Sequence, residues 1–216
     1  MKTFGYSTAK YPIRELIKTA LGVSSLSLIH KDEKFIYNNK FKRKNDQSTH
    51  YHKLFYELAR TKEFSVLYRE FLLDCVKPIF QEEIVFQKIP TFRIHFPGNI
   101  AVGEYHRDRD YRDSDWAKDV KEKNFFLPIT DAFDTNTIWV ESEEGKEDFQ
   151  PMIKEYGQFV MWDGLNLKHG NKTNKETLSR ISFDFRVMPF SNYKPSDLGS
   201  INTNTKFSLG GYYDKL

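Results

Sequence analysis

The sequence predicts a mainly β fold, a sandwich or barrel, with helices from the N-terminal third packed on one sheet. The chain has 19 Phe, 12 Tyr and 3 Trp in 216 residues, and flat rings suit the pleated, half-buried faces of strands. Beyond Pro78 the chain breaks into seven short β-like runs separated by Pro, Gly and Asn. Upstream of Pro78, apolar residues recur at helical spacing instead.

Three segments in the first third have the apolar spacing of helices. They span Pro12–Leu21, His50–Arg60 and Glu63–Val76. Pro12 suits a first helical turn, and Ser48 or Thr49 offers a cap for the second helix. Cys75 falls on the apolar face of the third helix, so we expect it to pack in the core. The polar stretch Lys31–Asp46 is too mixed in character to assign.

Seven strands are expected after the helices. They span Ile84–Gln87, Thr91–Phe96, Ala101–Asp108, Asn124–Ile129, Thr137–Glu141, Gln158–Trp162 and Ser179–Met188. Trp139, Trp162 and the pair Phe125–Phe126 are expected in the core. The tail beyond Pro189 is rich in Ser, Asn, Thr and Gly and is expected to be a loose end or a flap. The length favours one domain over residues 1–216, with helices in 1–80, the β core in 81–190 and an irregular tail in 191–216.

Charge balance and cysteine content limit the function classes. Lys and Arg number 33 against 30 Asp and Glu, and the net charge of +3 is too small for the basic field that nucleic-acid binding needs. Cys75 has no partner for an intrachain disulfide, and the first residues lack the apolar run of a signal peptide. No run approaches the ~18 apolar residues of a membrane span. We therefore expect a cytoplasmic protein that binds neither nucleic acid nor membrane, with its oligomeric state open.

A His and an Asp two positions apart end the predicted strand Ala101–Asp108. The period-2 geometry of a strand points the side chains of His106 and Asp108 to one face. With a third ligand from a distant strand, they would complete the two-His, one-carboxylate face that holds non-haem Fe(II) and leaves positions open for a cosubstrate and O₂. The pattern alone is a weak signal. His30-Lys31-Asp32 repeats it, but follows a segment that does not alternate, which disfavours that copy.

The downstream context favours the copy at His106 and Asp108. His169 supplies a distant histidine, and Arg180 and Ser182 follow it on one face of a predicted strand. A fixed guanidinium fork beside a hydroxyl suits the carboxylate of a ligand. The sequence therefore offers a candidate metal-ligand set and a candidate anchor for an acidic cosubstrate.

Other roles for the nearby arginines stay open. Arg186 shares the face of Arg180 and is an alternative anchor, and an ion pair from Arg180 to Asp184 or Glu104 would make Arg180 purely structural. Arg93 and His95 share one face of the preceding strand, which either reaches the site from the side or lies at the surface. We keep Arg93 as a candidate contact of the cosubstrate.

Together these residues resemble the Fe(II)/2-oxoglutarate-dependent oxygenases of the double-stranded β-helix type. The family order His-x-Asp, His, Arg-x-Ser maps onto His106, Asp108, His169, Arg180 and Ser182. A longer set of segments is similar to the StrG-like branch of streptomycin biosynthesis, near the phytanoyl-CoA hydroxylase-like enzymes. These segments are Pro90–Arg93, Pro97–Asn99, Glu104–His106, Asn136–Trp139, His169–Asn171 and Arg180–Arg186. The resemblance covers roughly residues 84–190 and implies a jelly-roll, cupin-like sandwich.

The resemblance also implies cofactors and roles. His106, Asp108 and His169 would hold Fe(II), 2-oxoglutarate would chelate the iron through its keto-acid end, and Arg180 and Ser182 would hold its far carboxylate. With O₂, the chemistry of the family converts 2-oxoglutarate into succinate and CO₂ and hydroxylates a substrate C–H bond. Related halogenating enzymes replace the carboxylate ligand by a small residue, so the presence of Asp108 favours hydroxylation.

The expected substrate is a small polar metabolite, which the StrG-like resemblance narrows to a sugar or aminocyclitol-like compound. The charged loop Arg107–Trp116 and the tail Ser200–Leu216 are expected to cover the barrel mouth, since both are polar and irregular. One alternative is a cupin-like metal-dependent isomerase or dioxygenase without 2-oxoglutarate, which would not need Arg180 and Ser182. The other is a non-catalytic sugar-binding sandwich, which would not need the metal ligands.

Overall fold

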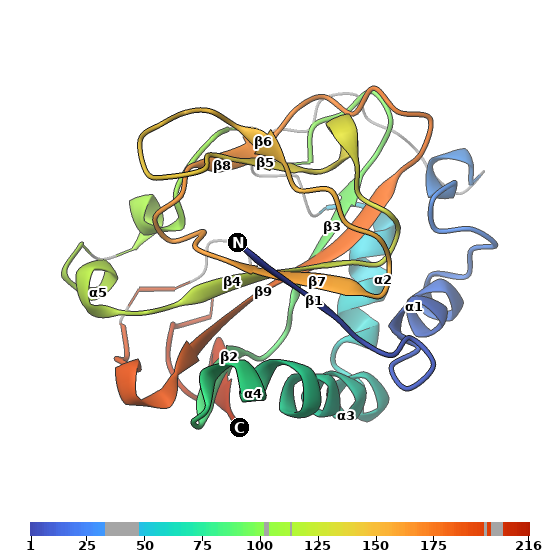
Figure 1. Cartoon of the computed structure of the whole chain (residues 1–216). Helices are drawn as coiled ribbons and strands as arrows, with labels where there is room; N and C mark the ends of the chain where they lie inside the picture. The colour runs from blue at the N-terminus through green and yellow to red at the C-terminus, as the bar shows by residue number, and fades with distance from the viewer. Residues whose placement is uncertain (33–47, 102–103, 113, 197, 200–204) are drawn as a thin grey trace.

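The computed structural model of the chain describes residues 1–32, 48–101, 104–112, 114–196, 198–199 and 205–216. Two antiparallel sheets face one another, and helices from the N-terminal third cover the outer side of the larger sheet (Figure 1). The predicted mainly β fold with N-terminal helices is therefore confirmed. Most of the unassigned stretch Lys31–Asp46 lies outside the described residues.

The larger sheet is organised around one long strand near its centre. In order across the sheet, its strands are β1 (Lys2–Gly5), β7 (Gln158–Trp162), β4 (Lys123–Pro128), β9 (Arg180–Pro189), β2 (Ile84–Gln87) and β10 (Tyr213–Lys215). A further strand, β3 (Thr91–His95), pairs with the first half of β9, while β2 pairs with its second half. Strand β9 is thus hydrogen-bonded along both edges, which fixes its register against β4 and β3.

The smaller sheet covers the inner face of the larger one. Its strands are β6 (Gln150–Pro151), β5 (Ile138–Val140) and β8 (His169–Asn171). Side chains from both sheets form an apolar cluster between them, with Phe126 and Val160 on the larger sheet and Ile138 and Val140 on the smaller. This cluster holds the two sheets together beside the inner cavity.

The alternation of β9 separates the core from the cavity. Phe183 and Phe185 point outward into the main hydrophobic core and are fully buried beneath the helices. Arg180, Asp184 and Arg186 instead line the cavity between the sheets, as the period of two requires. One strand therefore contributes both to the core and to the site.

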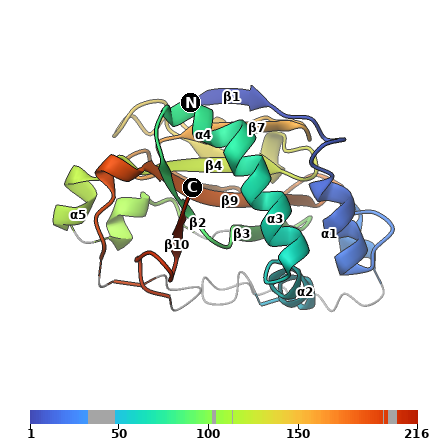
Figure 2. The same ribbon diagram turned by 90° about the horizontal axis from the view of Figure 1, so that it is seen from below.

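The helices pack on the outer face of the larger sheet, as the view from below shows (Figure 2). They are α1 (Ile13–Leu21), α2 (His50–Leu58), α3 (Lys62–Phe71) and α4 (Lys77–Phe80), with a short α5 (Ser114–Asp119) beyond the sheet edge. Thr49 caps α2 by accepting a hydrogen bond from the backbone of His52, which confirms one of the two expected caps. None of the described helices has both the length and the apolar content needed to cross a bilayer.

The third expected helix runs further than its predicted end at Val76. A π-helical stretch, Leu72–Val76, joins α3 to α4, and Pro78 lies in the first turn of α4. A proline is tolerated there because its missing N–H needs no intrahelical partner. Cys75, on the π-helical stretch, is partly buried and packs against the main core, as expected.

Three of the four aromatic residues expected in the core are buried there, and Trp139 is not. Phe125 and Phe126 are fully buried and Trp162 is 5% exposed. Trp139 is only half-buried, with the ammonium of Lys172 3.1 Å from its ring centroid. The outward-facing surface of the small strand β5 therefore remains accessible.

Two sequence-based expectations are wrong. The segment Ala101–Asp108 is not a described strand: His106 forms an isolated bridge, and Asp108 begins a 3₁₀ turn. The end of the chain is also no loose tail, because Tyr213 begins strand β10 and is fully buried. With Phe207 and Tyr212 it forms a second apolar cluster, which also buries Trp116 of the charged loop. Aromatic side chains hold this polar segment in place, against the expectation from its composition.

The packing of α3 on the sheet gives a test of the main core. Phe71 is fully buried, with its ring centroid 5.5 Å from that of Phe159 and 5.3 Å from that of Tyr6. We expect Phe71→Ala to lower the free energy of unfolding by about 3–5 kcal/mol in a urea titration, because it leaves a cavity in this core. Val66 lies on the same helix and is 44% exposed, so Val66→Ala should change stability by less than about 1 kcal/mol. Equal losses in the two variants would contradict this packing.

Candidate metal centre

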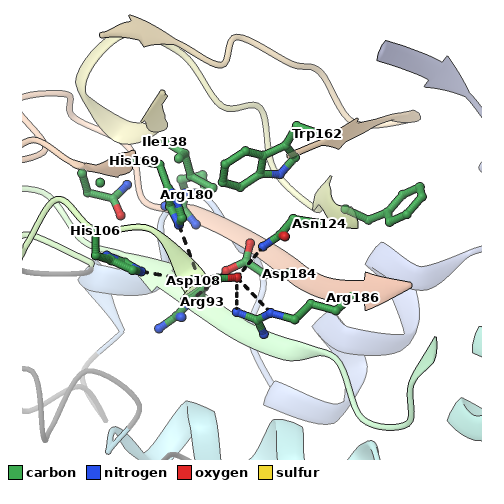
Figure 3. A pocket seen from close by; sticks show the side chains of 13 residues that line it. Arg93, His106, Asp108, Asn124, Ile138, Trp162, His169, Arg180, Asp184 and Arg186 are labelled. Carbon is green, nitrogen blue, oxygen red and sulfur yellow. Dashed lines mark hydrogen bonds and ion pairs between the residues drawn. The ribbon is translucent and has the colours of Figure 1, made fainter. Parts of the chain in front are cut away.

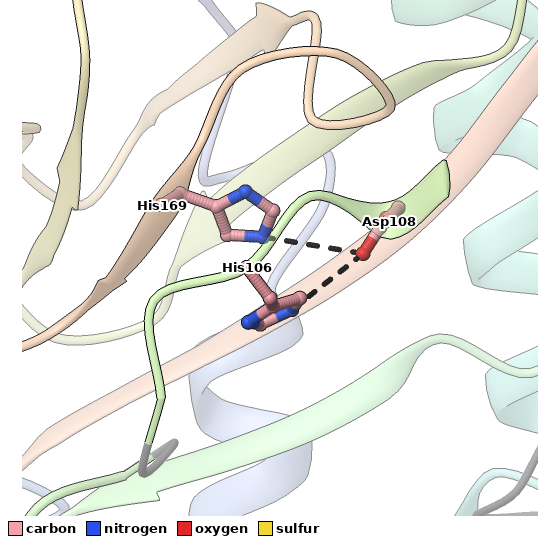
Figure 4. A group of neighbouring side chains, drawn as sticks. All are labelled: His106, Asp108 and His169. Atoms are coloured by element: carbon pink, nitrogen blue, oxygen red, sulfur yellow. Dashed lines mark ion pairs between the residues drawn. The ribbon is translucent and has the colours of Figure 1, made fainter. Parts of the chain in front are cut away.

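Two separate segments bring the predicted metal ligands together. The backbones of His106 and His169 are paired in an antiparallel bridge, with both N–H to O distances at 2.9 Å. The N–H of Asp108 donates to the carbonyl of Gly164 at 3.0 Å, which holds the start of the 3₁₀ turn against the β7–β8 connection. Two backbone contacts, rather than one strand face, thus position the three side chains (Figure 4).

The three side chains converge on one point. Oδ1 of Asp108 lies 3.8 Å from Nε2 of His106 and 4.0 Å from Nε2 of His169. One ligand atom from each side chain lies within 4.8 Å of the others, and the described part of the chain holds no other such group of His, Cys, Asp and Glu. Two imidazole nitrogens and a carboxylate oxygen fit a non-haem Fe(II) site in number, type and convergence.

Hydrogen bonds set both histidines in the form that binds metal. Nδ1 of His106 is 2.8 Å from the carbonyl oxygen of Glu104, and Nδ1 of His169 is 2.9 Å from that of Leu167. A carbonyl can only accept, so each Nδ1 carries the proton and donates it. In the neutral form of either imidazole, this tautomer leaves Nε2 with a lone pair facing Asp108, as metal ligation requires.

Electrostatics keep the ligands in the protonation states that a cation needs. Burial alone would raise the pKa of the Asp108 carboxyl, but the charges of Arg186 and His169 and the hydrogen bond from Asn124 hold it well below its usual value. Burial lowers the pKa of His169 to about 4, against the opposing effect of Asp108. At neutral pH the site therefore offers an ionised carboxylate and a neutral buried imidazole.

Arg180, the first residue of the second predicted element, lines the same cavity as the metal ligands (Figure 3), and Ser182 is fully buried next to it. Arg180 is 1% exposed, donates from Nε to the carbonyl of Asn136 at 3.0 Å and from Nη1 to Oγ of Ser182 at 2.5 Å. Burial lowers the pKa of its guanidinium to about 10, so it stays cationic at neutral pH. Its contacts within the described chain include no carboxylate ion pair, to Asp184, Glu104 or any other residue.

The other candidate arginines are paired. Arg93 donates from Nε to Oδ2 of Asp184 at 3.0 Å, and both line the cavity. Arg186 donates to Oδ2 of Asp108 from Nε at 2.9 Å and from Nη2 at 2.7 Å. His95 is buried outside the cavity lining, with its ring nitrogens against the carbonyls of Asn136 and Asn99. Of these three arginines, only Arg180 has no carboxylate in ion-pair contact within the described chain, and the charge of Asp184 acts on it from further away.

Sequence reasoning missed two residues next to Asp108. Asn124 donates from Nδ2 to Oδ2 of Asp108 at 2.7 Å. Gly164 lets the Asn124 amide approach, because a Cβ at position 164 would lie 2.5 Å from Cγ of Asn124. The alternation of β4 could have placed Asn124 on the inner face, but no local signal marks Gly164. The rejected copy of the motif lies elsewhere: Nδ1 of His30 is 2.8 Å from Oγ of Ser179.

A comparison with known proteins identifies a relative along almost the whole chain. The streptomycin biosynthesis protein StrG of Streptomyces griseus is 34% identical over 213 residues, which is 98% of this chain and 96% of the relative. The match therefore extends over the N-terminal helices as well as residues 84–190. No model of a protein family matches the chain.

Solved structures give likenesses of fold. EctD from S. alaskensis, solved with 2-oxoglutarate and 5-hydroxyectoine, aligns over 97% of this chain and 76% of its own, at 12% identity and a TM-score of 0.51. HygX from Streptomyces hygroscopicus, with nickel and 2-oxoglutarate bound, aligns over 93% and 87% at 10% identity and a TM-score of 0.49. At this level of identity the likeness to EctD concerns the fold alone.

The ligand set makes a direct prediction for metal binding. His106→Ala, Asp108→Ala and His169→Ala should each abolish stoichiometric Fe(II) binding, because each removes one of three convergent donors. His30→Ala is the matched control and should bind like the unaltered protein. Anaerobic calorimetry with Fe(II) measures metal binding in the three ligand variants and in the control. Loss of binding in His30→Ala, with binding intact in His106→Ala, would show that the other copy of the motif is the ligand.

Proposed function

Because the chain belongs to the family of the streptomycin biosynthesis protein StrG, we propose that it is an Fe(II)- and 2-oxoglutarate-dependent oxygenase. His106, Asp108 and His169 would hold the iron. Bound Fe(II) would supply the activation of O₂ that no amino-acid side chain provides. The chain's own residues bind and orient the reactants around it, in a double-stranded β-helix sandwich whose inner face is formed by β9, β4 and β8.

The observation that carries the proposal is the unpaired charge of Arg180. A buried guanidinium without a carboxylate is costly, because desolvation is not repaid by an ion pair. Within the described chain, Arg93, Arg180 and Arg186 line the cavity against only two carboxylates, those of Asp108 and Asp184. This lining carries one more positive than negative charge, a divalent cation would add two more, and a dianionic cosubstrate such as 2-oxoglutarate would offset two of these three positive charges.

The local geometry assigns a task to each residue at this end of the cavity. The carbonyl of Asn136 and the Oγ of Ser182 hold the guanidinium of Arg180 from two sides. Since Oγ of Ser182 accepts from Arg180, its own proton remains available for the ligand. Arg180 and Ser182 would together bind the far carboxylate of 2-oxoglutarate through charge-assisted hydrogen bonds. Arg93, already paired with Asp184, would be a secondary contact.

The substrate we propose is a small polar metabolite, a sugar or aminocyclitol-like compound that is hydroxylated. His106 is the most exposed ligand, at 17% against 10% for His169 and 7% for Asp108, so the site opens on its side. Charged side chains lie next to it, with Arg107 and Arg109 both paired to Glu144. Such a rim suits hydroxyl and amino groups better than an acyl chain. The ionised Asp108 favours hydroxylation over halogenation.

The anchor predicts a specific loss of cosubstrate affinity. Arg180→Ala should weaken 2-oxoglutarate binding by about 2–4 kcal/mol, because a charge-assisted carboxylate pair is lost. Ser182→Ala and Arg93→Ala should each weaken 2-oxoglutarate binding by less than Arg180→Ala does. The weak visible charge-transfer band of the anaerobic Fe(II) protein with 2-oxoglutarate follows the titration, and Fe(II) calorimetry shows that each variant still holds metal. An unchanged 2-oxoglutarate affinity in Arg180→Ala would show that Arg180 is not the anchor. Metal binding without the charge-transfer band would favour the cupin-like enzyme that does not use 2-oxoglutarate.

The substrate class is tested by turnover. Sugars, aminocyclitols, amino acids and acyl-CoA esters are offered with Fe(II), 2-oxoglutarate and O₂, and succinate release is measured together with a product mass gain of one oxygen. We expect stimulation by a compound of the sugar or aminocyclitol groups. Turnover with acyl-CoA esters alone would contradict the polar substrate while leaving the iron site in place. If a sugar binds tightly to the metal-free protein and no succinate is released in the turnover assay, the non-catalytic sugar-binding alternative would be favoured.

A further inference from the structure

The two oxygens of Asp108 face different partners. Oδ1 faces the Nε2 atoms of His106 and His169 at 3.8 and 4.0 Å. Oδ2 accepts three hydrogen bonds, one from Asn124 at 2.7 Å and two from Arg186 at 2.9 and 2.7 Å. Three donors fully occupy one oxygen of a carboxylate. Only Oδ1 is left to bind a metal ion.

Arg186 is itself held by the end of the chain. Its Nη1 donates to the hydroxyl of Tyr212 at 2.7 Å, so all of its nitrogens have a hydrogen-bond partner. Tyr212 is 6% exposed, and its ring packs edge-on against Phe207 and Tyr213 at centroid distances of 4.9 and 4.8 Å. The hydroxyl that orients Arg186 therefore comes from a rigid aromatic cluster.

A second ion pair behind Arg186 keeps it directed at Asp108. Glu122 is fully buried and lies 3.7 Å from Nε of Arg186, so it could compete for that guanidinium. Arg112 instead donates to Glu122 at 3.0 Å, and the hydroxyl of Tyr213 donates to its other oxygen. Arg112 is thus paired with Glu122, and the shorter hydrogen bonds of Arg186 go to Asp108.

We propose that Arg186, oriented by Tyr212, limits Asp108 to one bond with the metal and so keeps a coordination position open for 2-oxoglutarate. The reason is that a carboxylate can bind a cation through one or both oxygens. A second bond through Oδ2 would fill a position that the two-His, one-carboxylate set leaves free. This inference rests on the proposed function, and it makes the C-terminal segment, residues 205–216, part of the metal centre. Arg186 and Tyr212 are positioning residues in it.

The test uses Co(II) as a spectroscopic substitute for Fe(II) in the full chain, without O₂. The variants are Tyr212→Phe, Arg186→Gln and Arg186→Lys, and the control is Tyr193→Phe. Tyr193 packs against the same aromatic cluster, but its hydroxyl accepts from the backbone of Leu209 at 2.9 Å and has no contact with Arg186. Calorimetry gives the Co(II) affinity, the 2-oxoglutarate affinity of the Co(II)-loaded protein is measured separately, and the visible d–d bands report the coordination number.

The expected result separates cosubstrate binding from metal binding. Arg186→Gln should lower the 2-oxoglutarate affinity of the loaded protein about 10- to 100-fold. Its d–d bands without cosubstrate should weaken, as an added ligand oxygen raises the coordination number. Tyr212→Phe should show the same change to a smaller degree, Arg186→Lys should restore part of the loss, and Tyr193→Phe should match the unaltered protein.

Two results would overturn the proposal. One is unchanged d–d bands and 2-oxoglutarate affinity in both Arg186→Gln and Tyr212→Phe. The other is lower Co(II) affinity with normal cosubstrate affinity once loaded, which would make the pair merely structural. If the unaltered protein binds Co(II) but not 2-oxoglutarate, the proposed function fails, and the d–d bands still show whether Asp108 gains a second metal bond in Arg186→Gln.

Discussion

The structure depends on the register of β9, the strand that supplies both the core and the site. Phe183 and Phe185 are fully buried on its outer face, while Arg180, Asp184 and Arg186 line the cavity on its inner face. A slip by one residue would exchange the two sets, placing charges among phenylalanines and rings at the site. Pairing with β4 on one edge and with β3 and β2 on the other prevents such a slip.

The inner face tolerates its charges because nearly all of them are matched. Arg186 is paired with Asp108, Arg93 with Asp184 and Arg112 with Glu122. Buried ions cost several kcal/mol each unless paired, so these pairs hold the side chains in defined positions. Arg180 lines the same cavity as the His–Asp–His group and, within the described chain, has no carboxylate in ion-pair contact, which is why we propose it as the anchor for an anion. The proposed function rests on this difference between Arg180 and the other two arginines that line the cavity.

Periodic patterns made much of the architecture predictable. Strands β2 and β7 have the predicted bounds, and the helices α1 and α2 begin within one residue of expectation, because each shows one clear period. The grouping of His106, Asp108 and His169 was expected, although for the wrong local reason. They meet through a backbone bridge and a 3₁₀ turn, features that depend on tertiary contacts.

The features that the sequence did not predict are contacts between residues far apart in the chain. Asn124 reaches Asp108 only because β4 pairs with β9 and Gly164 has no side chain. The C-terminal segment looked irregular from its Ser, Asn and Gly content, yet Tyr213 pairs with Gln87 of β2 and is fully buried. Local composition describes how a segment would behave alone, whereas these residues are fixed by elements distant in the chain.

The central claim is that one cavity holds a metal at His106, Asp108 and His169 and an acidic cosubstrate at Arg180. The most direct test is a crystal structure grown without O₂ from the full chain with Fe(II) and 2-oxoglutarate, with anomalous data at the iron edge. The account predicts one iron peak bound by both Nε2 atoms and by Oδ1 of Asp108, with the far carboxylate of 2-oxoglutarate on Arg180 and Ser182. Iron at other residues, or a cosubstrate carboxylate bound away from Arg180, would contradict it.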